Sequence, residues 1–253
     1  MIRANHPQPA EREYLTEVLP FRAMVQPESL DFKALASEIV GRMRTLASFS
    51  TADVRALRRE FSKRIARAPA EQVLDLAFLL LGRPDFLFRF LAYELVCHHR
   101  AALQSLGAKE LERFGHGLDS WPAVDTFASY LSGPAWREHQ VPDSLIHRWA
   151  RSEDRWRRRA ALVSTVPLNN KARGGTGDSE RTLKVCSMLT NDRDDMVVKA
   201  LSWALRELAK RDPKAVREFL ESHKEILAAR VIREAQDKLS TGLKNPRKGR
   251  NHE

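Results

Sequence analysis

The chain has 253 residues, of which 43% are hydrophobic; this is enough to fill one sizeable domain or repeat array and excludes a disordered protein. A formal net charge of +10 favours polyanionic partners such as DNA, RNA or an anionic membrane surface, without choosing among them. Cys97 and Cys186 lie in no CxxC or mixed Cys/His pattern, so neither a zinc site nor a disulfide framework is predicted. The longest strongly apolar run, residues 76–81, is too short to cross a bilayer, and residues 1–7 lack the apolar core of a signal peptide. We expect a cytoplasmic protein.

Residues 1–30 carry prolines and little periodicity, which predicts an extended or partly ordered arm. Most of the chain between this arm and the C-terminal tail is predicted to be helical. The expected helices cover residues 32–48, 51–67, 70–82, 85–105, 108–115, 120–132, 142–151, 153–166, 178–190, 194–211, 213–222 and 225–239. Residues 240–253 combine glycine, proline and cationic residues, so this basic tail is expected to be disordered.

Helix start signals support several of these ranges. Ser50 and Asp212 each stand directly before a predicted helix, and Ser120 precedes a Trp-Pro pair. No segment shows the β-branched alternation of a strand. Short helices, short turns and recurring apolar patches predict an all-α fold, an α-solenoid of stacked antiparallel helix pairs of HEAT-like type over residues 31–239, with a concave basic face.

Two polar features are interpreted as non-catalytic. The glycine-rich segment 167–178 lacks a Gly-Lys-Ser/Thr ending and a preceding strand, so it is expected to be a mobile basic loop that can touch a DNA backbone rather than a phosphate loop. The histidines at positions 98, 99, 139 and 147 have no metal-binding spacing and are interpreted as surface or capping residues. We expect no metal and no cofactor.

Trp203 is placed unusually on its predicted helix. At about 100° per residue, Trp203 lies opposite the apolar stripe and shares its side with cations. The stripe consists of Val198, Leu201, Leu205 and Leu208, and the cations are Lys199, Arg206 and Lys210. A large aromatic residue among cations indicates a surface that stacks on or shields negative charge, and nucleic acid is the first candidate.

Trp121 and Asp125 are four residues apart, on adjacent turns of one helix face. The apolar stripe of this helix runs through Val124, Phe127 and Leu131, so Trp121 lies at its margin and Asp125 further round. The pair can face a cleft. The alternative is structural: an acid in the first turn beside a half-buried tryptophan.

Arg159 projects onto the apolar side of its helix, whereas Arg157 points the other way. A buried guanidinium needs a partner, so Arg159 either pairs with a carboxylate within the fold or binds a phosphate at the rim of a cleft. A solvated or phosphate-facing cluster is expected from Arg151, Arg155, Arg157 and Arg158, and core packing between helices from Trp149 and Trp156.

Taken in order, these motifs resemble the DNA alkylation repair enzyme family, the AlkD-type alkylpurine DNA glycosylases built from HEAT-like repeats. The resemblance rests on motif order and separation over about residues 118–222, and is only architectural over residues 32–117. The matching motifs are Trp121-x-x-x-Asp125, then Trp149, then Trp156-x-x-Arg159, then Lys199-x-x-x-Trp203-x-x-Arg206-x-x-x-Lys210. The segment 167–178 is longer than the family's usual turn there.

The resemblance implies a monofunctional enzyme that hydrolyses the N-glycosidic bond of alkylated purines in duplex DNA. It implies a catalytic carboxylate at Asp125, aromatic walls at Trp121 and Trp203, and a backbone phosphate contact at Arg159. The DNA-binding set is completed by Arg206, Lys210, Lys199 and Arg157. It further implies that the lesion is handled without an enclosing pocket for a flipped base.

The chemistry fits these residue types. Alkylation at N3 or N7 leaves a positive charge on the purine, so the base departs readily, and a carboxylate stabilises the oxocarbenium-like sugar or positions water. No lysine is placed as a Schiff-base nucleophile. Two alternatives stay open, a non-catalytic DNA-structure binder and a protein-interaction solenoid with a basic face. The simplest expectation is a monomer that binds duplex DNA, with neither a membrane nor an obligate protein partner.

Overall fold

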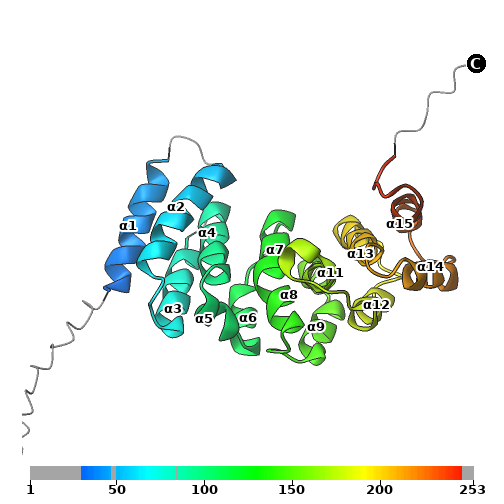
Figure 1. The fold of residues 1–253 in the computed structure, drawn as a ribbon, viewed down its shortest axis with the longest axis horizontal. Coiled ribbons are helices and arrows are strands. Elements are labelled where there is room, and N and C mark those ends of the chain that lie inside the picture. Colours follow the sequence, from blue (N-terminus) through cyan, green and yellow to red (C-terminus); the bar gives the residue numbers. More distant parts are fainter. Residues whose placement is uncertain (1–29, 47–49, 84, 247–253) are drawn as a thin grey trace, which may run out of the picture. The chain divides into compact units, whose positions relative to one another are not determined.

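The computed structural model describes residues 30–46, 50–83 and 85–246, and every regular element in these ranges is a helix (Figure 1). The helices belong to one compact unit that begins at Phe32. The expected N-terminal arm lies outside the described residues as far as residue 29, and so do residues 247–253 of the expected tail. Among the helices described, none is long and apolar enough to span a membrane.

In chain order, the helices fall into three successive groups, of which the first begins at Phe32. The first group comprises α1 (Phe32–Arg44), α2 (Thr51–Arg64), α3 (Ala70–Leu81), α4 (Phe86–Cys97), α5 (Arg100–Gln104) and α6 (Ala108–Phe114). The second comprises α7 (Trp121–Phe127), the π-helix η1 (Ala128–Ser132), α8 (Gly133–Arg137), α9 (Asp143–Ala150), α10 (Arg155–Ser164) and α11 (Val166–Asn169). The third comprises the 3₁₀ turn η2 (Lys171–Arg173), α12 (Ser179–Ser187), α13 (Asp195–Leu208), α14 (Pro213–Ser222) and α15 (Ala229–Thr241).

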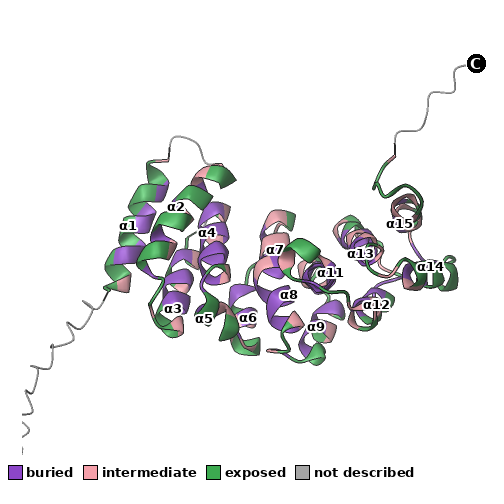
Figure 2. Cartoon of the chain, in the orientation of Figure 1, coloured by how far each residue is buried: buried purple, intermediate pink, exposed green. Residues whose placement is uncertain are grey.

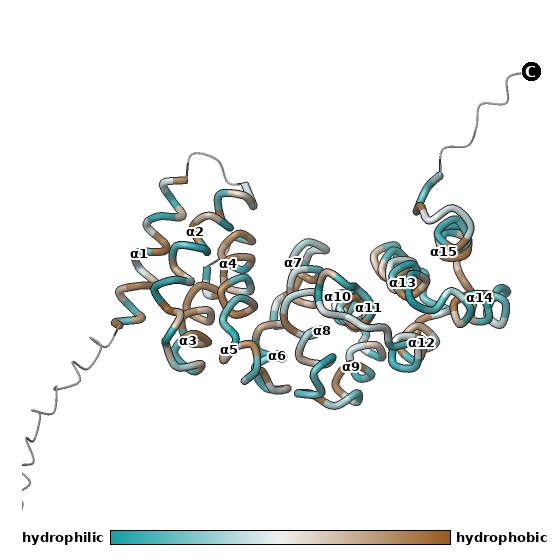
Figure 3. Tube along the Cα trace, viewed as in Figure 1, coloured by the Kyte–Doolittle hydropathy of each residue, from teal (hydrophilic) through white to brown (hydrophobic). Residues whose placement is uncertain are grey.

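Helices pack mainly against near neighbours in the sequence. One row passes through α2, α4, α7, α10, α13 and α15, each in contact with the next, and α1, α3, α9, α12 and α14 pack beside it. Outer helices such as α1, α2 and α14 are buried along one side and exposed on the other, and their hydrophobic residues follow the buried side (Figures 2 and 3). In contrast, α4, α8 and α11 contain no exposed residue. Contact limited to neighbouring units is typical of a solenoid, so the predicted all-α array of stacked helix pairs is confirmed.

An aromatic cluster in the core fixes α7, which carries Trp121 and Asp125. The ring of Phe127 lies 5.9 Å from that of Tyr93 on α4 and 5.8 Å from that of Trp149 on α9. The Tyr93 hydroxyl donates a hydrogen bond to the carbonyl of Phe114 at 2.7 Å, so this buried polar group has a partner. The predicted core position of Trp149 is confirmed.

Residues predicted to start helices occupy N-cap positions in the structure, and His99 is a further N-cap that was not predicted. The side chains of Ser50 and Asp212 cap α2 and α14, as predicted. Ser120 occupies the N-cap position of α7 without a side-chain bond to the backbone. The predicted helix 85–105 is interrupted, because His99 leaves α4 and its Nδ1 accepts a hydrogen bond from the amide of Ala102 to start α5. That capping role agrees with the interpretation of this histidine.

The predicted helix 120–132 changes its winding after α7. Residues 128–132 form a π-turn, and the amide of Gly133 bonds the carbonyl of Ala128. Pro134 follows and has no amide hydrogen, so an α-helical bond is missing at this position and the wider turn accommodates its loss. Gly133 is required here because an added Cβ would lie 2.6 Å from Pro167 and 2.8 Å from the carbonyl of Ser164.

Residues 167–178 run from the end of α11 through η2 into a defined turn, rather than forming the mobile loop expected. Gly174 has φ of 82°, a conformation that favours glycine. A Cβ on Gly175 would lie 2.5 Å from the carbonyl oxygen of Pro167, so the chain approaches itself too closely for any other residue. Arg211 then donates to the carbonyls of Asn169 at 2.8 Å and Gly175 at 2.6 Å. These contacts hold the glycine-rich segment against the helices.

Candidate functional site

Six residues selected from the sequence line one pocket of about 460 Å³. They come from three helices that pack in succession, α7, α10 and α13. The six are Trp121, Asp125, Arg159, Lys199, Trp203 and Arg206, and Met196 and Lys244 complete the lining. The structure thus brings together side chains that lie up to 85 positions apart in the sequence, from Trp121 to Arg206.

On α7 the pocket receives one exposed and one largely covered side chain. Trp121 is 55% exposed, an unusual value for a tryptophan, which normally lies largely buried. The Asp125 side chain is 17% exposed. The opposite side of α7 is anchored by the buried residues Ala123, Val124 and Phe127. The i, i+4 spacing therefore places the aromatic ring and the carboxylate on the face that the core leaves free.

Asp125 and Arg159 form a bidentate ion pair. Nε and Nη2 of Arg159 donate to Oδ1 and Oδ2 of Asp125, both at 2.8 Å, and Nη1 donates to the carbonyl of Met196 at 2.5 Å. The Arg159 side chain is only 6% exposed. Of the two alternatives for this buried guanidinium, the structure shows pairing with a carboxylate. Two parallel charge-assisted bonds fix the plane and direction of the Asp125 carboxylate.

Burial raises the pKa of the Asp125 carboxyl above its ordinary value. The hydrogen bonds and the positive charge of Arg159 oppose this rise because they favour the ionised carboxylate. The carboxylate is thus less solvated than a surface aspartate, and Arg159 is the group that keeps it charged. A desolvated carboxylate interacts more strongly with a positive charge that develops beside it.

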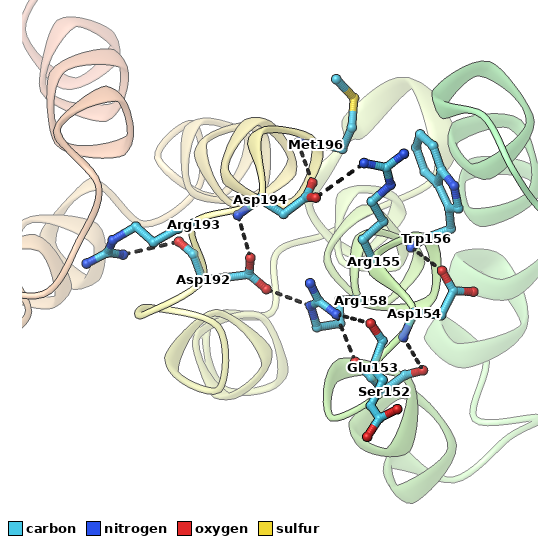
Figure 4. A network of polar contacts seen from close by, with 10 residues as sticks. All are labelled: Ser152, Glu153, Asp154, Arg155, Trp156, Arg158, Asp192, Arg193, Asp194 and Met196. Atoms are coloured by element: carbon cyan, nitrogen blue, oxygen red, sulfur yellow. Dashed lines mark hydrogen bonds and ion pairs between the residues drawn. The ribbon is translucent and has the colours of Figure 1, made fainter.

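A polar network fixes the starts of α10 and α13, the helices that supply Arg159 and Trp203 (Figure 4). Nε of Arg158 donates to Asp192 at 2.6 Å, and Nη1 donates to the carbonyls of Ser152 and Glu153. The other oxygen of Asp192 accepts from the amide of Asp194, whose own carboxylate caps α13 through the amide of Met196. The turn before α10 is therefore tied directly to the turn before α13.

This network changes the interpretation of the arginine cluster. Arg158 is an interhelical ion-pair residue and not part of a solvated cluster, because the arginine fork matches carbonyls and a carboxylate on two different turns. Arg155 pairs with Asp194 at 3.5 Å and lies over the Trp156 ring, and its side chain stays 52% exposed. Trp156 is half-buried against the core. Arg151 is exposed, as expected.

α13 forms the second wall of the pocket. Trp203 is half-buried: it packs against the core on one side and lines the pocket on the other. Lys199 lines the same pocket and pairs with Asp195 at 2.6 Å. The outward placement predicted from helical projection is thus correct for the pocket, although Trp203 is less isolated from the core than that projection implied.

Arg206 is covered and borders the pocket next to α15. Its Nε donates to the hydroxyl of Ser202 at 3.2 Å and lies 3.7 Å from Glu234 of α15. Burial lowers the pKa of Arg206, which reflects the cost of burying its charge, and nearby glutamates oppose that effect. Lys244 also approaches Glu234, at 3.6 Å. Sequence reasoning missed Lys244, because it lies in the segment expected to be disordered, whereas α15 continues to Thr241.

Met196 is the other residue that the sequence did not reveal. Its carbonyl accepts the third hydrogen bond of Arg159, and every residue type has such a carbonyl. No side-chain pattern could have signalled this role. The peptide group matters because it completes the set of acceptors that orients the guanidinium toward Asp125.

Two predicted DNA-binding residues are not brought to this pocket. Nη1 of Arg157 pairs with Glu112 at 2.9 Å, and its guanidinium lies 5.6 Å from the Trp149 ring centre, so Arg157 joins α10 to α6 and α9. Nζ of Lys210 pairs with Glu207 at 2.7 Å and is not among the pocket residues. Both cations already have carboxylate partners within the fold.

The pocket combines one oriented carboxylate, two tryptophan rings and several cations. Such a set can hold a phosphate-bearing ligand by its cations, contact a flat or cationic group by its rings, and stabilise positive charge at the carboxylate. Within the described ranges no cluster of three or more His, Cys, Asp and Glu side chains is placed to hold a metal ion.

Comparisons with known proteins agree in family and fold. The family model described as DNA alkylation repair enzyme matches residues 38–239. A predicted DNA alkylation repair enzyme from Enterococcus faecalis has a similar structure, with a TM-score of 0.62 at 17% identity, covering 83% of this chain and 94% of that chain. AlkD2 from Streptococcus mutans gives a TM-score of 0.58 at 16% identity, covering 84% and 99%. No curated protein sequence matches the chain.

Proposed function

The chain belongs to the DNA alkylation repair enzyme family, and from this premise we propose that it is a monofunctional glycosylase. The proposed reaction is hydrolysis of the N-glycosidic bond of purines that carry a cationic N3- or N7-alkyl group in duplex DNA. The single observation that carries the proposal is the Asp125 carboxylate, held bidentately by Arg159 in a pocket bordered by Trp121 and Trp203.

Asp125 supplies the electrostatic part of the proposed mechanism. As the cationic purine departs with its bonding electrons, positive charge develops on the deoxyribose, and a carboxylate beside the sugar stabilises it or orients the attacking water. At about 4 Å and an effective dielectric of about 20, two unit charges attract by about 4 kcal/mol. If the transition state gains all of that energy, the rate rises by nearly 10³.

Trp121 and Trp203 serve as aromatic walls. Their rings contact the damaged nucleotide, attract its positive charge and exclude water from the sugar. The exposure of Trp121 supports this role, because its ring is available to a ligand without any rearrangement of the core. Lys199, Arg206 and Lys244 provide positive charge for the flanking phosphates.

Arg159 acts as a positioning residue in this mechanism. The resemblance implied a backbone phosphate contact, yet its three guanidinium nitrogens are already engaged by Asp125 and the carbonyl of Met196. We therefore assign to Arg159 the task of keeping the Asp125 carboxylate ionised and aimed into the pocket. We assign the phosphate contact instead to the more exposed cations of the pocket.

The test is single-turnover release of alkylpurine from methylated duplex DNA. Asp125→Asn preserves shape and removes the charge, so base release should fall by about 10³ while binding to undamaged duplex persists. Asp119→Asn is the matched control, because Asp119 is an exposed carboxylate that is not part of the pocket. Release that is equally fast in Asp125→Asn rejects this carboxylate as the catalyst.

A non-catalytic DNA-structure binder is the second candidate. It is favoured by the fact that both oxygens of Asp125 already accept hydrogen bonds, as they would in a purely structural ion pair. In that case the wild-type protein binds duplex DNA and releases no base from any alkylated substrate. The same experiment therefore separates the two functions.

A further inference from the structure

A second pocket, of about 630 Å³, is lined by four arginines and lies apart from the Asp125 pocket. Arg55 and Arg58 come from α2, Arg137 from α8, and Arg173 from the glycine-rich turn after α11. The two pockets share no residue. The residues that line it besides the arginines include Glu94, His98, Ser129 and Tyr130.

Contacts within the protein orient these guanidinium groups. Nε of Arg55 and Nε of Arg58 donate to the two oxygens of Glu94, at 3.2 and 3.1 Å. Glu94 is buried, with a side chain only 2% exposed. One buried carboxylate therefore holds two arginines of α2 side by side.

Arg137 and Arg173 are oriented by backbone carbonyls. Nη1 of Arg137 donates to the carbonyl of Arg173, and Nη1 of Arg173 donates to the carbonyl of Ser129 at 3.2 Å. The Arg173 guanidinium also lies over the Tyr130 ring, 4.6 Å from its centre. The turn after α11 is thus folded so that one of its cations faces α8 and η1.

Each arginine keeps unused donors. Across the described part of the chain, no hydrogen bond engages Nη1 and Nη2 of Arg58, Nη1 of Arg55, Nη2 of Arg137, or Nε and Nη2 of Arg173. None of these atoms is among the described buried nitrogens that lack a partner. The pocket therefore presents pre-oriented donors to an external acceptor.

The charge balance selects an anionic acceptor. The carboxylates facing the arginines are Glu94 and Glu138, the latter paired with Nε of Arg137 at 2.8 Å. Four guanidinium groups against two carboxylates leave a net positive pocket, and His98, 3.9 Å from Glu94, adds to it when protonated. Several forked donors around one cavity match the tetrahedral oxygens of a phosphate better than a planar carboxylate.

One continuous helical segment contributes residues to both this pocket and the Asp125 pocket. Ser129 and Tyr130 belong to η1, which follows α7 without a break. Asp125 and Tyr130, which line the two pockets, are therefore only five positions apart on this segment.

We propose that Arg55, Arg58, Arg137 and Arg173 form a site for a backbone phosphate of the DNA duplex, separate from the pocket around Asp125. This proposal rests on the proposed function only in taking duplex DNA as the ligand. It assigns a role to the glycine-rich turn, which delivers Arg173 to the site. The site contributes affinity and fixes the position of the protein on the duplex. It does not contribute sequence specificity, because phosphate contacts carry no sequence information.

Binding of a labelled, undamaged duplex to the full-length protein tests the site, measured by fluorescence anisotropy at several salt concentrations. Arg173→Gln should weaken binding about tenfold, as for one lost charge-assisted hydrogen bond, and reduce the log–log salt slope by about 0.9. Arg173→Lys, which keeps the charge without the fork, should restore the salt slope and only part of the affinity. Arg217→Gln is the matched control, because Arg217 is exposed on α14 and lies outside both pockets.

Thermal melts of each variant establish that the fold is retained. If Arg173→Gln melts with the wild type yet binds duplex with the affinity and salt slope of Arg217→Gln, the site proposal is overturned. Titration with inorganic phosphate at constant ionic strength distinguishes the source of the phosphate. Phosphate binding that depends on Arg173, combined with unchanged duplex binding, likewise overturns the assignment to DNA.

The outcome is independent of the glycosylase proposal, since undamaged duplex is the ligand. A wild-type protein that releases no alkylpurine but shows the Arg173-dependent salt slope retains the phosphate site and loses the proposed reaction. A wild-type protein that releases alkylpurine while Arg173→Gln and Arg217→Gln bind alike retains the reaction and loses the site.

Discussion

Removal of the Arg159 guanidinium should destabilise the protein in a pH-dependent way. Arg159→Gln deletes both bonds to the Asp125 carboxylate and leaves this group largely covered and without its cation. Breaking a buried ion pair from one side costs about 3–5 kcal/mol, because the remaining charge stays desolvated. The Asp125 side chain keeps 17% of its surface exposed, so we expect the lower end, about 3 kcal/mol.

The sign of the pH effect follows from the pKa of Asp125. Burial raises this pKa, and Arg159 opposes the rise. Without Arg159 the rise is larger, so the folded variant binds a proton more readily than its unfolded chain. A carboxyl with a raised pKa contributes stability below its unfolded pKa and loses it as pH rises through the folded value. The gap between wild type and Arg159→Gln should therefore be small in acid and grow toward neutral pH.

Urea unfolding between about pH 4 and pH 7 measures this gap, and thermal melts at neutral pH should show a loss of roughly 6–12 °C for a chain of this size. A double-mutant cycle with Asp125→Asn isolates the pair: the double variant removes both charges and should regain most of the lost stability. Arg151→Gln, which changes an exposed arginine on the neighbouring turn, should stay within about 0.5 kcal/mol of wild type.

Two results would refute this reasoning. A loss in Arg159→Gln that is the same at pH 4 and pH 7 would mean that cavity formation, and not the stranded carboxylate, causes it. A double variant as unstable as the sum of the two single variants would mean that Asp125 and Arg159 are not coupled in solution.

Two further predictions each compare a pair of substitutions at positions with different surroundings. Trp121→Ala should lower the free energy of unfolding by less than about 1 kcal/mol because Trp121 is 55% exposed, whereas Trp203→Ala should lower it by about 2 kcal/mol because Trp203 is half-buried. Both variants should slow alkylpurine release at least tenfold. Equal losses of stability in thermal melts would contradict the placement of Trp121. Gly175→Ala should destabilise the fold by at least about 2 kcal/mol, since its Cβ would lie 2.5 Å from a carbonyl oxygen. Gly41→Ala should stabilise the fold by up to about 1 kcal/mol, because Gly41 lies inside α1 and its Cβ would have nothing within 4 Å. Urea unfolding midpoints that shift in the same direction in both variants would exclude this steric explanation.

Local sequence patterns were sufficient for the features that depend on one helix. Ser50 and Asp212 marked helix starts, and the apolar stripe of α13 placed Trp203 on the side that lines the pocket. These predictions hold because capping involves residues two or three apart and helical faces repeat every three or four. The interruption at His99 was local too, but the longer apolar pattern of residues 85–105 masked it. The continuation of the helical segment past Ser132 into α8 was not predicted.

The sequence by itself determined an all-helical array, the family and the candidate residues Trp121, Asp125, Arg159 and Trp203. Only the tertiary structure decided which partner each charge has: Arg159 meets Asp125 across 34 positions, whereas Arg157, two residues away, turns to Glu112. It also folded the glycine-rich turn so that Arg173 reaches a second pocket. The reason is physical, because periodicity reports which side of a helix a residue occupies, whereas an ion pair depends on which helix packs against that side.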